Sequence, residues 1–176
     1  MKKNLIAVAF AATAALSMSN AFAAAGTVNF TGEILNDACI VDVASQNQTV
    51  DLGSYHKAEF VRAGDSTSAK KFSIVLKNCP ATVSTARVRF DGTPEATDSS
   101  LLAIDSTTIG AATGVAINLM SADKSQLPLH GDNNYRYALN TTADNILNFY
   151  AQYKSTVDNV TAGPANAATS FSVVYN

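Results

Sequence analysis

The chain has 176 residues, of which 15% are charged, and its formal net charge is −2. Soluble domains usually carry about 25% charged residues, and the sequence has no cluster of Lys and Arg that could follow a phosphate backbone, which argues against a nucleic-acid-binding protein. The length that remains after the N-terminal segment fits one domain.

The first 23 residues predict a cleaved secretory signal rather than a part of the fold. Two lysines near the start precede an apolar run from Leu5 to Met18, and Ala21-Phe22-Ala23 forms a small-x-small cleavage site. The apolar run is too short to cross a membrane core of roughly 30 Å, which disfavours a membrane anchor. We therefore expect residues 1–23 to be removed and the exported chain to begin at Ala24.

A short segment before the first cysteine has the pattern of a strand that is apolar on one side. An ordinary first strand of the same domain is one explanation. A glycine on the apolar side, however, weakens an internal strand and suits close approach to a groove. We therefore expect residues 24–38 to form an extension whose strand lies apart from the domain at residues 39–176. The apolar side consists of Val28, Phe30, Gly32 and Ile34, and the polar side consists of Thr27, Asn29, Thr31 and Glu33.

The rest of the chain predicts an all-β domain. Helical periodicity is nearly absent, and short runs of β-branched and aromatic residues are separated by Gly, Pro, Asn and Asp. Residues 54–69 lack a clear period and predict a loop with a short helical turn. Ten short strands around one core favour a two-sheet sandwich of immunoglobulin type. The predicted strands are Thr27–Ile34, Cys39–Val43, Thr49–Leu52, Lys71–Asn78, Ala86–Phe90, Leu101–Ile104, Val115–Ser121, Tyr135–Leu139, Leu147–Tyr153 and Ser170–Tyr175.

The two cysteines predict one disulfide bond. Cys39 and Cys79 are the only cysteines, and an even cysteine count in an exported chain is typical of a disulfide. Closing a loop of this length stabilises the fold by about 4 kcal/mol in the chain-entropy model.

The end of the chain also has a strand pattern. Phe171, Val173 and Tyr175 alternate with Ser170, Ser172 and Val174, and neither a turn nor a further strand follows. We expect a sandwich that lacks its last strand, in which these three apolar residues line the groove left open. A chain whose domain lacks its last strand, and which carries a spare strand at its other end, is expected to polymerise.

The sequence offers no convincing catalytic, metal or cofactor site. His56 and His130 are the only histidines, and both lie in polar, turn-like contexts that favour solvated side chains. Two histidines without a spare cysteine do not make a common transition-metal site. Nucleophile-elbow, dinucleotide-binding and P-loop motifs are absent. We expect a protein that is not an enzyme and binds no cofactor.

Several motifs, in order along the chain, resemble the pilins assembled by the chaperone–usher pathway, and in particular the major subunit of type 1 fimbriae. The resemblance extends over essentially all of the chain after the signal. The matching motifs are Thr27-Val28-x-Phe30-x-Gly32-Glu33-Ile34 before Cys39, Phe72-x-Ile74-x-Leu76-x-x-Cys79, Gly114-Val115-Ala116-Ile117-x-Leu119, Phe149-x-Ala151-x-Tyr153, Ala162-Gly163, and Phe171-x-Val173-x-Tyr175.

The resemblance implies a structural fimbrial subunit that supports cell adhesion. It implies an incomplete immunoglobulin-like sandwich, completed in trans by the donor strand of the next copy. The implied partners are a periplasmic pilus chaperone that docks at the Phe171, Val173 and Tyr175 edge, an outer-membrane usher, copies of the same chain and other fimbrial subunits. The implied route leads through the periplasm to the extracellular fimbria.

Three alternatives remain open from the residues. One is a minor or tip fimbrial subunit, and a second is a secreted carbohydrate-binding sandwich. A tip adhesin of this pathway normally carries an extra N-terminal domain, and only residues 24–38 lie between the expected cleavage site and Cys39. The third is a small secreted hydrolase, which the lack of an acid–base pair disfavours.

Overall fold

The computed structural model describes residues 26–35, 38–131 and 133–176. The predicted signal peptide and its cleavage site lie outside the described residues. The chain divides into two units, Met1–Ile34 and Leu35–Asn176. In the part of the chain that the structure describes, no helix is long and apolar enough to cross a membrane.

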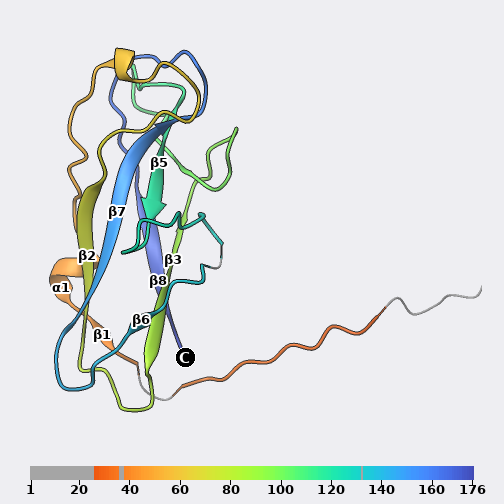
Figure 1. Cartoon of the computed structure of the whole chain (residues 1–176), viewed down its shortest axis with the longest axis vertical. Coiled ribbons are helices and arrows are strands. Elements are labelled where there is room, and N and C mark those ends of the chain that lie inside the picture. The colour runs from red at the N-terminus through yellow and green to blue at the C-terminus, as the bar shows by residue number, and fades with distance from the viewer. Residues whose placement is uncertain (1–25, 36–37, 132) are drawn as a thin grey trace, which may run out of the picture. The chain divides into compact units, whose positions relative to one another are not determined.

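The second unit contains two antiparallel sheets, which confirms the all-β prediction. The larger sheet has the order β1-β2-β7-β5-β4 and the smaller one the order β6-β3-β8. Figure 1 shows β3 and β8 side by side, in a layer apart from β2 and β7. The strands are β1 (Ile40–Val41), β2 (Lys70–Lys77), β3 (Thr85–Gly92), β4 (Leu102–Ala103), β5 (Val115–Met120), β6 (Tyr137–Ala138), β7 (Asn145–Ser155) and β8 (Thr169–Tyr175), and the short helices are α1 (Val43–Gln46) and the 3₁₀ helix η1 (Lys57–Glu59).

Phenylalanine side chains join the two sheets. Phe72 of β2 lies opposite Phe149 of β7 in the strand register, and their rings stack with centroids 5.5 Å apart. Phe90 of β3 meets Phe149 edge-on, with centroids 5.4 Å apart. Both geometries are favourable for aromatic pairs. The period of two in β2 and β7 therefore directs these rings into one core between the layers.

The disulfide prediction is confirmed. Cys39 and Cys79 are bonded, with a sequence separation of 40 residues, and both are buried. Cys39 directly precedes β1 and Cys79 follows β2, so the bond closes the end of the β1–β2 pair. The pair itself is short, because only Ile40 and Val41 have partners on β2.

Several predicted strands were wrong or too long. Those predicted at Leu101–Ile104 and Tyr135–Leu139 are reduced to the two-residue strands β4 and β6. The strand predicted at Cys39–Val43 is shortened to two residues because Asp42 starts α1, accepting a hydrogen bond from the Ala44 amide at 3.0 Å. Asp is a favoured N-cap residue. Within the described residues, Thr49–Leu52 has no strand partner. The loop predicted at residues 54–69 is confirmed, and its helical turn is η1.

Replacing both cysteines by alanine tests the contribution of the disulfide. We expect the free energy of unfolding to fall by about 4 kcal/mol, because the unfolded chain regains the freedom of a 40-residue loop. Urea unfolding followed by circular dichroism measures the change. Non-reduced peptide mapping of the parent protein is the control, and two free thiols there would contradict the bond.

Candidate strand-acceptor edge

Strand β8 is hydrogen-bonded on one side only. It pairs with β3 from Ala86 opposite Tyr175 to Gly92 opposite Thr169. Among the described residues, no other strand lies beside it. It is therefore an edge strand, and edge strands offer their free backbone groups to another chain.

The register shows which backbone groups point outward. The amides of Thr85 and Asn176 each donate to the other residue's carbonyl, at 3.2 and 3.0 Å. Hydrogen-bonded and non-hydrogen-bonded pairs alternate along an antiparallel ladder. The backbone groups of Phe171, Val173 and Tyr175 therefore point away from β3, toward the open side of the sheet.

The same three residues have side chains that pack against the core but are only partly buried. The intervening Ser170, Ser172 and Val174 are exposed. The alternation predicted from the sequence is thus present, and the structure gathers the predicted groove residues on one strand. Incomplete burial next to an open backbone edge gives β8 a strip of apolar surface, which we call the β8 edge.

Tyr175 has a polar contact at the end of the β8 edge. Its hydroxyl lies 3.4 Å from the Cys39 carbonyl oxygen, which accepts its hydrogen bond. Burial raises the pKa of Tyr175 above its usual value, and the neutral phenol can donate this bond. This contact ties the C-terminal end of β8 to the disulfide-linked start of the larger sheet.

A pocket of about 520 Å³ is lined mainly by residues 49–55 and by residues 160–166, which precede β8. This pocket was not predicted from the sequence, although its lining includes the predicted strand Thr49–Leu52 and the Ala162-Gly163 motif. Tyr153 of β7 also lines it and donates from its hydroxyl to the Ala165 carbonyl at 2.9 Å. Val50 of the wall also packs partly buried against the core. The wall at residues 49–52 has strand-like residues without a strand neighbour among the described segments.

Gly163 is necessary for the shape of this pocket. A Cβ atom there would lie 2.0 Å from the Gly110 carbonyl oxygen and 2.7 Å from the Ala112 amide nitrogen. Both are backbone atoms, so a side chain would force the two loops apart. Ala112 also donates its amide to the Pro164 carbonyl at 2.9 Å, and this bond requires the same close approach.

The N-terminal unit contributes residues 26–34, which have no regular secondary structure. The strand predicted at Thr27–Ile34 is therefore not formed within this chain, because a strand needs a neighbour for its backbone groups. Val28, Phe30 and Ile34 are 75%, 93% and 96% exposed. Three large apolar side chains at alternate positions are thus left without cover.

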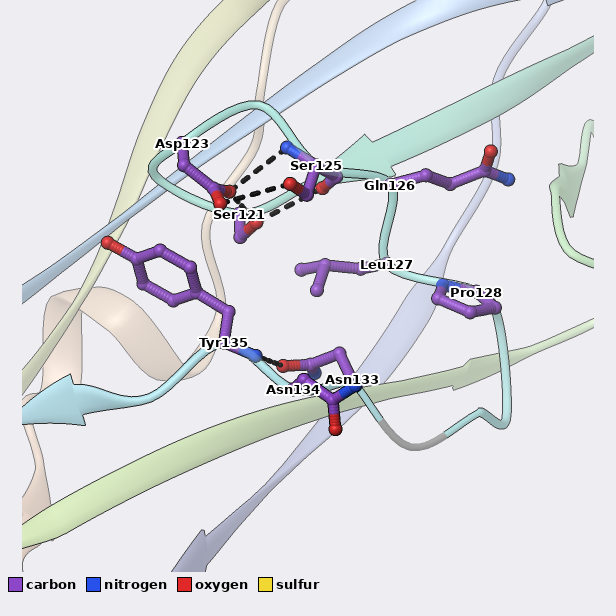
Figure 2. Close-up of a pocket in the computed structure, with 9 residues that line it drawn as sticks. All are labelled: Ser121, Asp123, Ser125, Gln126, Leu127, Pro128, Asn133, Asn134 and Tyr135. Carbon is purple, nitrogen blue, oxygen red and sulfur yellow. Dashed lines mark hydrogen bonds between the residues drawn. The ribbon is translucent and has the colours of Figure 1, made fainter.

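A second pocket, of about 450 Å³, lies after β5 and is lined by both polar and apolar side chains (Figure 2). Asp123 accepts hydrogen bonds from the hydroxyls of Ser121 and Ser125, and the Ser121 hydroxyl holds the pKa of this carboxyl below its usual value. The opposite wall includes Asn133, whose side-chain oxygen accepts from the Tyr135 amide at 3.1 Å. These polar groups largely satisfy each other.

The two histidines lie in exposed turns, as the sequence predicted. His56 caps η1 by accepting from the Ala58 amide at 3.1 Å. His130 contacts Asp91 and the Gly92 carbonyl through its two ring nitrogens. Its hydrogen bond holds the pKa of Asp91 below the usual value. These contacts hold turns in place and lie outside the lining of either pocket.

Comparison with known proteins gives a consistent result. The family model described as "Fimbrial protein" matches residues 28–176. Fimbrial subunit type 1 of Salmonella typhimurium is 39% identical over 154 residues, covering 85% of this chain and 82% of the relative. A type I fimbria protein and antigen of Burkholderia pseudomallei has a similar structure, with a TM-score of 0.60 and 33% identity over 85% of this chain and 97% of the other. The P pilus rod subunit PapA shares the fold, with a TM-score of 0.67 and 24% identity, covering 80% of this chain and all of PapA.

Hydrogen exchange of the subunit tests the β8 register. We expect the amides of Phe171, Val173 and Tyr175 to exchange faster than those of Ser172 and Val174, because only the latter face β3. Amide exchange measured residue by residue by NMR on the monomer gives the comparison. Equal protection along the strand would contradict an open edge.

Proposed function

The chain belongs to the fimbrial protein family, and from this premise we propose that it is a structural subunit of a bacterial surface fimbria that polymerises by donor-strand exchange and supports cell adhesion. The β8 edge receives the N-terminal segment of the next copy. The relatives named above are fimbrial subunits rather than enzymes, and we propose no catalytic activity for this chain.

The observation that carries the proposal is the state of the β8 edge. Its outward backbone groups have no strand partner among the described residues, and its inward side chains are partly uncovered. Strand addition satisfies both needs, since main-chain hydrogen bonds fill the edge and alternate side chains complete the core. Pilins are among the proteins in which this mode of recognition occurs.

Residues 26–34 supply what such an edge requires. Val28, Phe30 and Ile34 present apolar side chains on one side, and all three are exposed in the single chain. Gly32 lies on the same side and has no heavy atom within 4 Å of where its Cβ would be. In the complex it would permit close backbone approach at that position.

The donor segment and the β8 edge are different surfaces of the same chain, so the contact between copies is heterologous. A heterologous contact whose rotation does not close generates an open filament rather than a ring. A fibre with one donor and one acceptor in each subunit follows, and other fimbrial subunits with the same two surfaces can join it.

The open edge also requires protection before assembly. We propose that a periplasmic chaperone covers Phe171, Val173 and Tyr175 after residues 1–23 have been removed, and that an outer-membrane usher exchanges the chaperone for the next subunit's segment. An exposed apolar edge is an aggregation site if it is left uncovered. The disulfide fits this route, because an oxidising compartment favours its formation.

Phe30→Asp tests the donor segment, with Asn29→Asp as the matched control. Each change adds one negative charge, and the two positions are adjacent in the same exposed segment. Phe30→Asp should block polymerisation, because burying the charge in an apolar site costs several kcal/mol. Asn29→Asp should leave polymers near the parent amount, because residue 29 lies on the polar side. SDS-resistant multimers and electron microscopy of the cells measure both outcomes.

Chaperone binding separates an assembly defect from a folding defect in this experiment. The Phe30→Asp chain should still co-purify with the chaperone, because the β8 edge is unchanged. Multimers of Phe30→Asp in parent amounts would overturn the proposal. Unfolding of the chaperone complex after deletion of residues 26–34 would do so too, by assigning the segment to its own domain.

Tyr175→Ala tests the acceptor side. Removing this ring takes away part of the inward apolar strip and the hydrogen bond to the Cys39 carbonyl. We expect less chaperone-bound subunit on co-purification and fewer fibres. Tyr150→Ala is the control, because Tyr150 lies on the opposite face of β7 from Phe149 and Ala151. Equal losses in both variants would contradict a special role of the β8 edge.

A further inference from the structure

The smaller sheet has a second edge, on the far side of β3 from β8. Strand β6 pairs only with Thr85 and Ala86 of β3. Residues 87–92 of β3 therefore have no strand neighbour on that side within the described chain. A bare edge of this length is a template for strand addition, so the sheet would have two acceptor edges unless something closes one.

Three hydrogen bonds from the segment between β5 and β6 close it. Carbonyl oxygens at alternate β3 positions face this side, and each accepts one bond. The Asn133 side-chain amide donates to the Val88 carbonyl at 2.7 Å. The His130 backbone amide donates to the Phe90 carbonyl at 3.0 Å, and its ring Nε2 lies 2.7 Å from the Gly92 carbonyl. We call His130 and Asn133 the β3 cap.

The cap is held in place from both sides. Leu129, next to His130, is buried in the main core, and its amide donates to the Ser100 carbonyl at 3.0 Å. His130 has a φ of 57°, a left-handed conformation that aims both its amide and its ring at β3. Its Nδ1 lies 2.9 Å from the Asp91 carboxylate. The Asn133 side chain is oriented by the amide of Tyr135, as Figure 2 shows.

The cap is not a strand, and this difference matters. A cap built from one backbone amide and two side-chain donors satisfies the carbonyls without presenting a new strand edge. The β8 edge has nothing comparable among the described residues. We propose that His130 and Asn133 close the β3 edge to strand addition, so that each subunit accepts a strand only at β8; the inference rests on the proposed function above.

This asymmetry decides the form of the assembly. A subunit with two open edges could pair with a second copy through β3 while β8 receives its donor strand. Fibres would then associate sideways or branch. A closed β3 edge leaves one donor and one acceptor, and growth is linear.

The test removes the cap in a chain that cannot polymerise through its donor segment. All proteins carry Phe30→Asp. His130→Pro with Asn133→Ala removes all three donors, because proline has no amide hydrogen and cannot adopt a φ of 57°. Asn133→Asp is a milder change that places an oxygen opposite the Val88 carbonyl. Asn134→Asp is the matched control, since Asn134 makes no bond to β3. Circular dichroism and protection of the Ser172 and Val174 amides verify folding.

Sedimentation measures self-association, and hydrogen exchange locates it. We expect the Asn134→Asp protein to remain monomeric and the uncapped proteins to form concentration-dependent dimers in which the Val88 and Phe90 amides become protected. If the double variant fails to fold, dimer formation by the Asn133→Asp protein alone tests the inference. A folded uncapped protein that stays monomeric, or a control with the same dimers, overturns the inference. Donor-type multimers that persist despite Phe30→Asp would instead overturn the proposed function.

Discussion

The organising constraint of this molecule is that backbone N–H and C=O groups at a sheet edge need partners. The two edges of the smaller sheet meet this requirement differently. On β3, the carbonyls of Val88, Phe90 and Gly92 are bonded within the chain. On β8, the outward groups of Phe171, Val173 and Tyr175 have no strand beside them in the part of the chain that the structure describes. The outward carbonyls of the β3 edge are bonded within the chain, whereas those of the β8 edge have no such partners among the described residues.

The hydrophobic core is also incomplete next to β8. The inner side is well packed where Phe72, Phe90 and Phe149 meet between the sheets. Toward β8 the side chains reach that core but keep part of their surface in water. Because the hydrophobic effect scales with the apolar area removed from water, a strand that covers this strip gains burial and hydrogen bonds together. Residues 26–34 have the alternation that such a strand needs, and among the described residues they pair with no strand of their own chain.

Much of this architecture could be predicted from the sequence, because a period of two directly reports which side chains face a core. The alternation around Phe72 and Phe149 located β2 and β7, and the one around Val173 located β8. The strand at Thr49–Leu52 failed because its residues have strand preferences but no neighbour in the single chain. Asp42 ended the first strand early, since a capping side chain competes locally with pairing. The contacts of His130 and Asn133 were not predictable, because they join residues about 40 positions apart through a loop without periodicity.

The position of the disulfide bears on how a fibre carries tension. In a polymer formed by the donor-strand exchange proposed above, each subunit would be pulled through its N-terminal segment, and the load would reach the disulfide at Cys39 before β1. The first strand after that point pairs with β2 through only two residues, and a pair that short would peel open under force. The Cys39–Cys79 bond transfers the load covalently to the end of β2, which is held along its length by β7. In such a polymer the bond would act as a covalent bypass around a strand pair of only two residues.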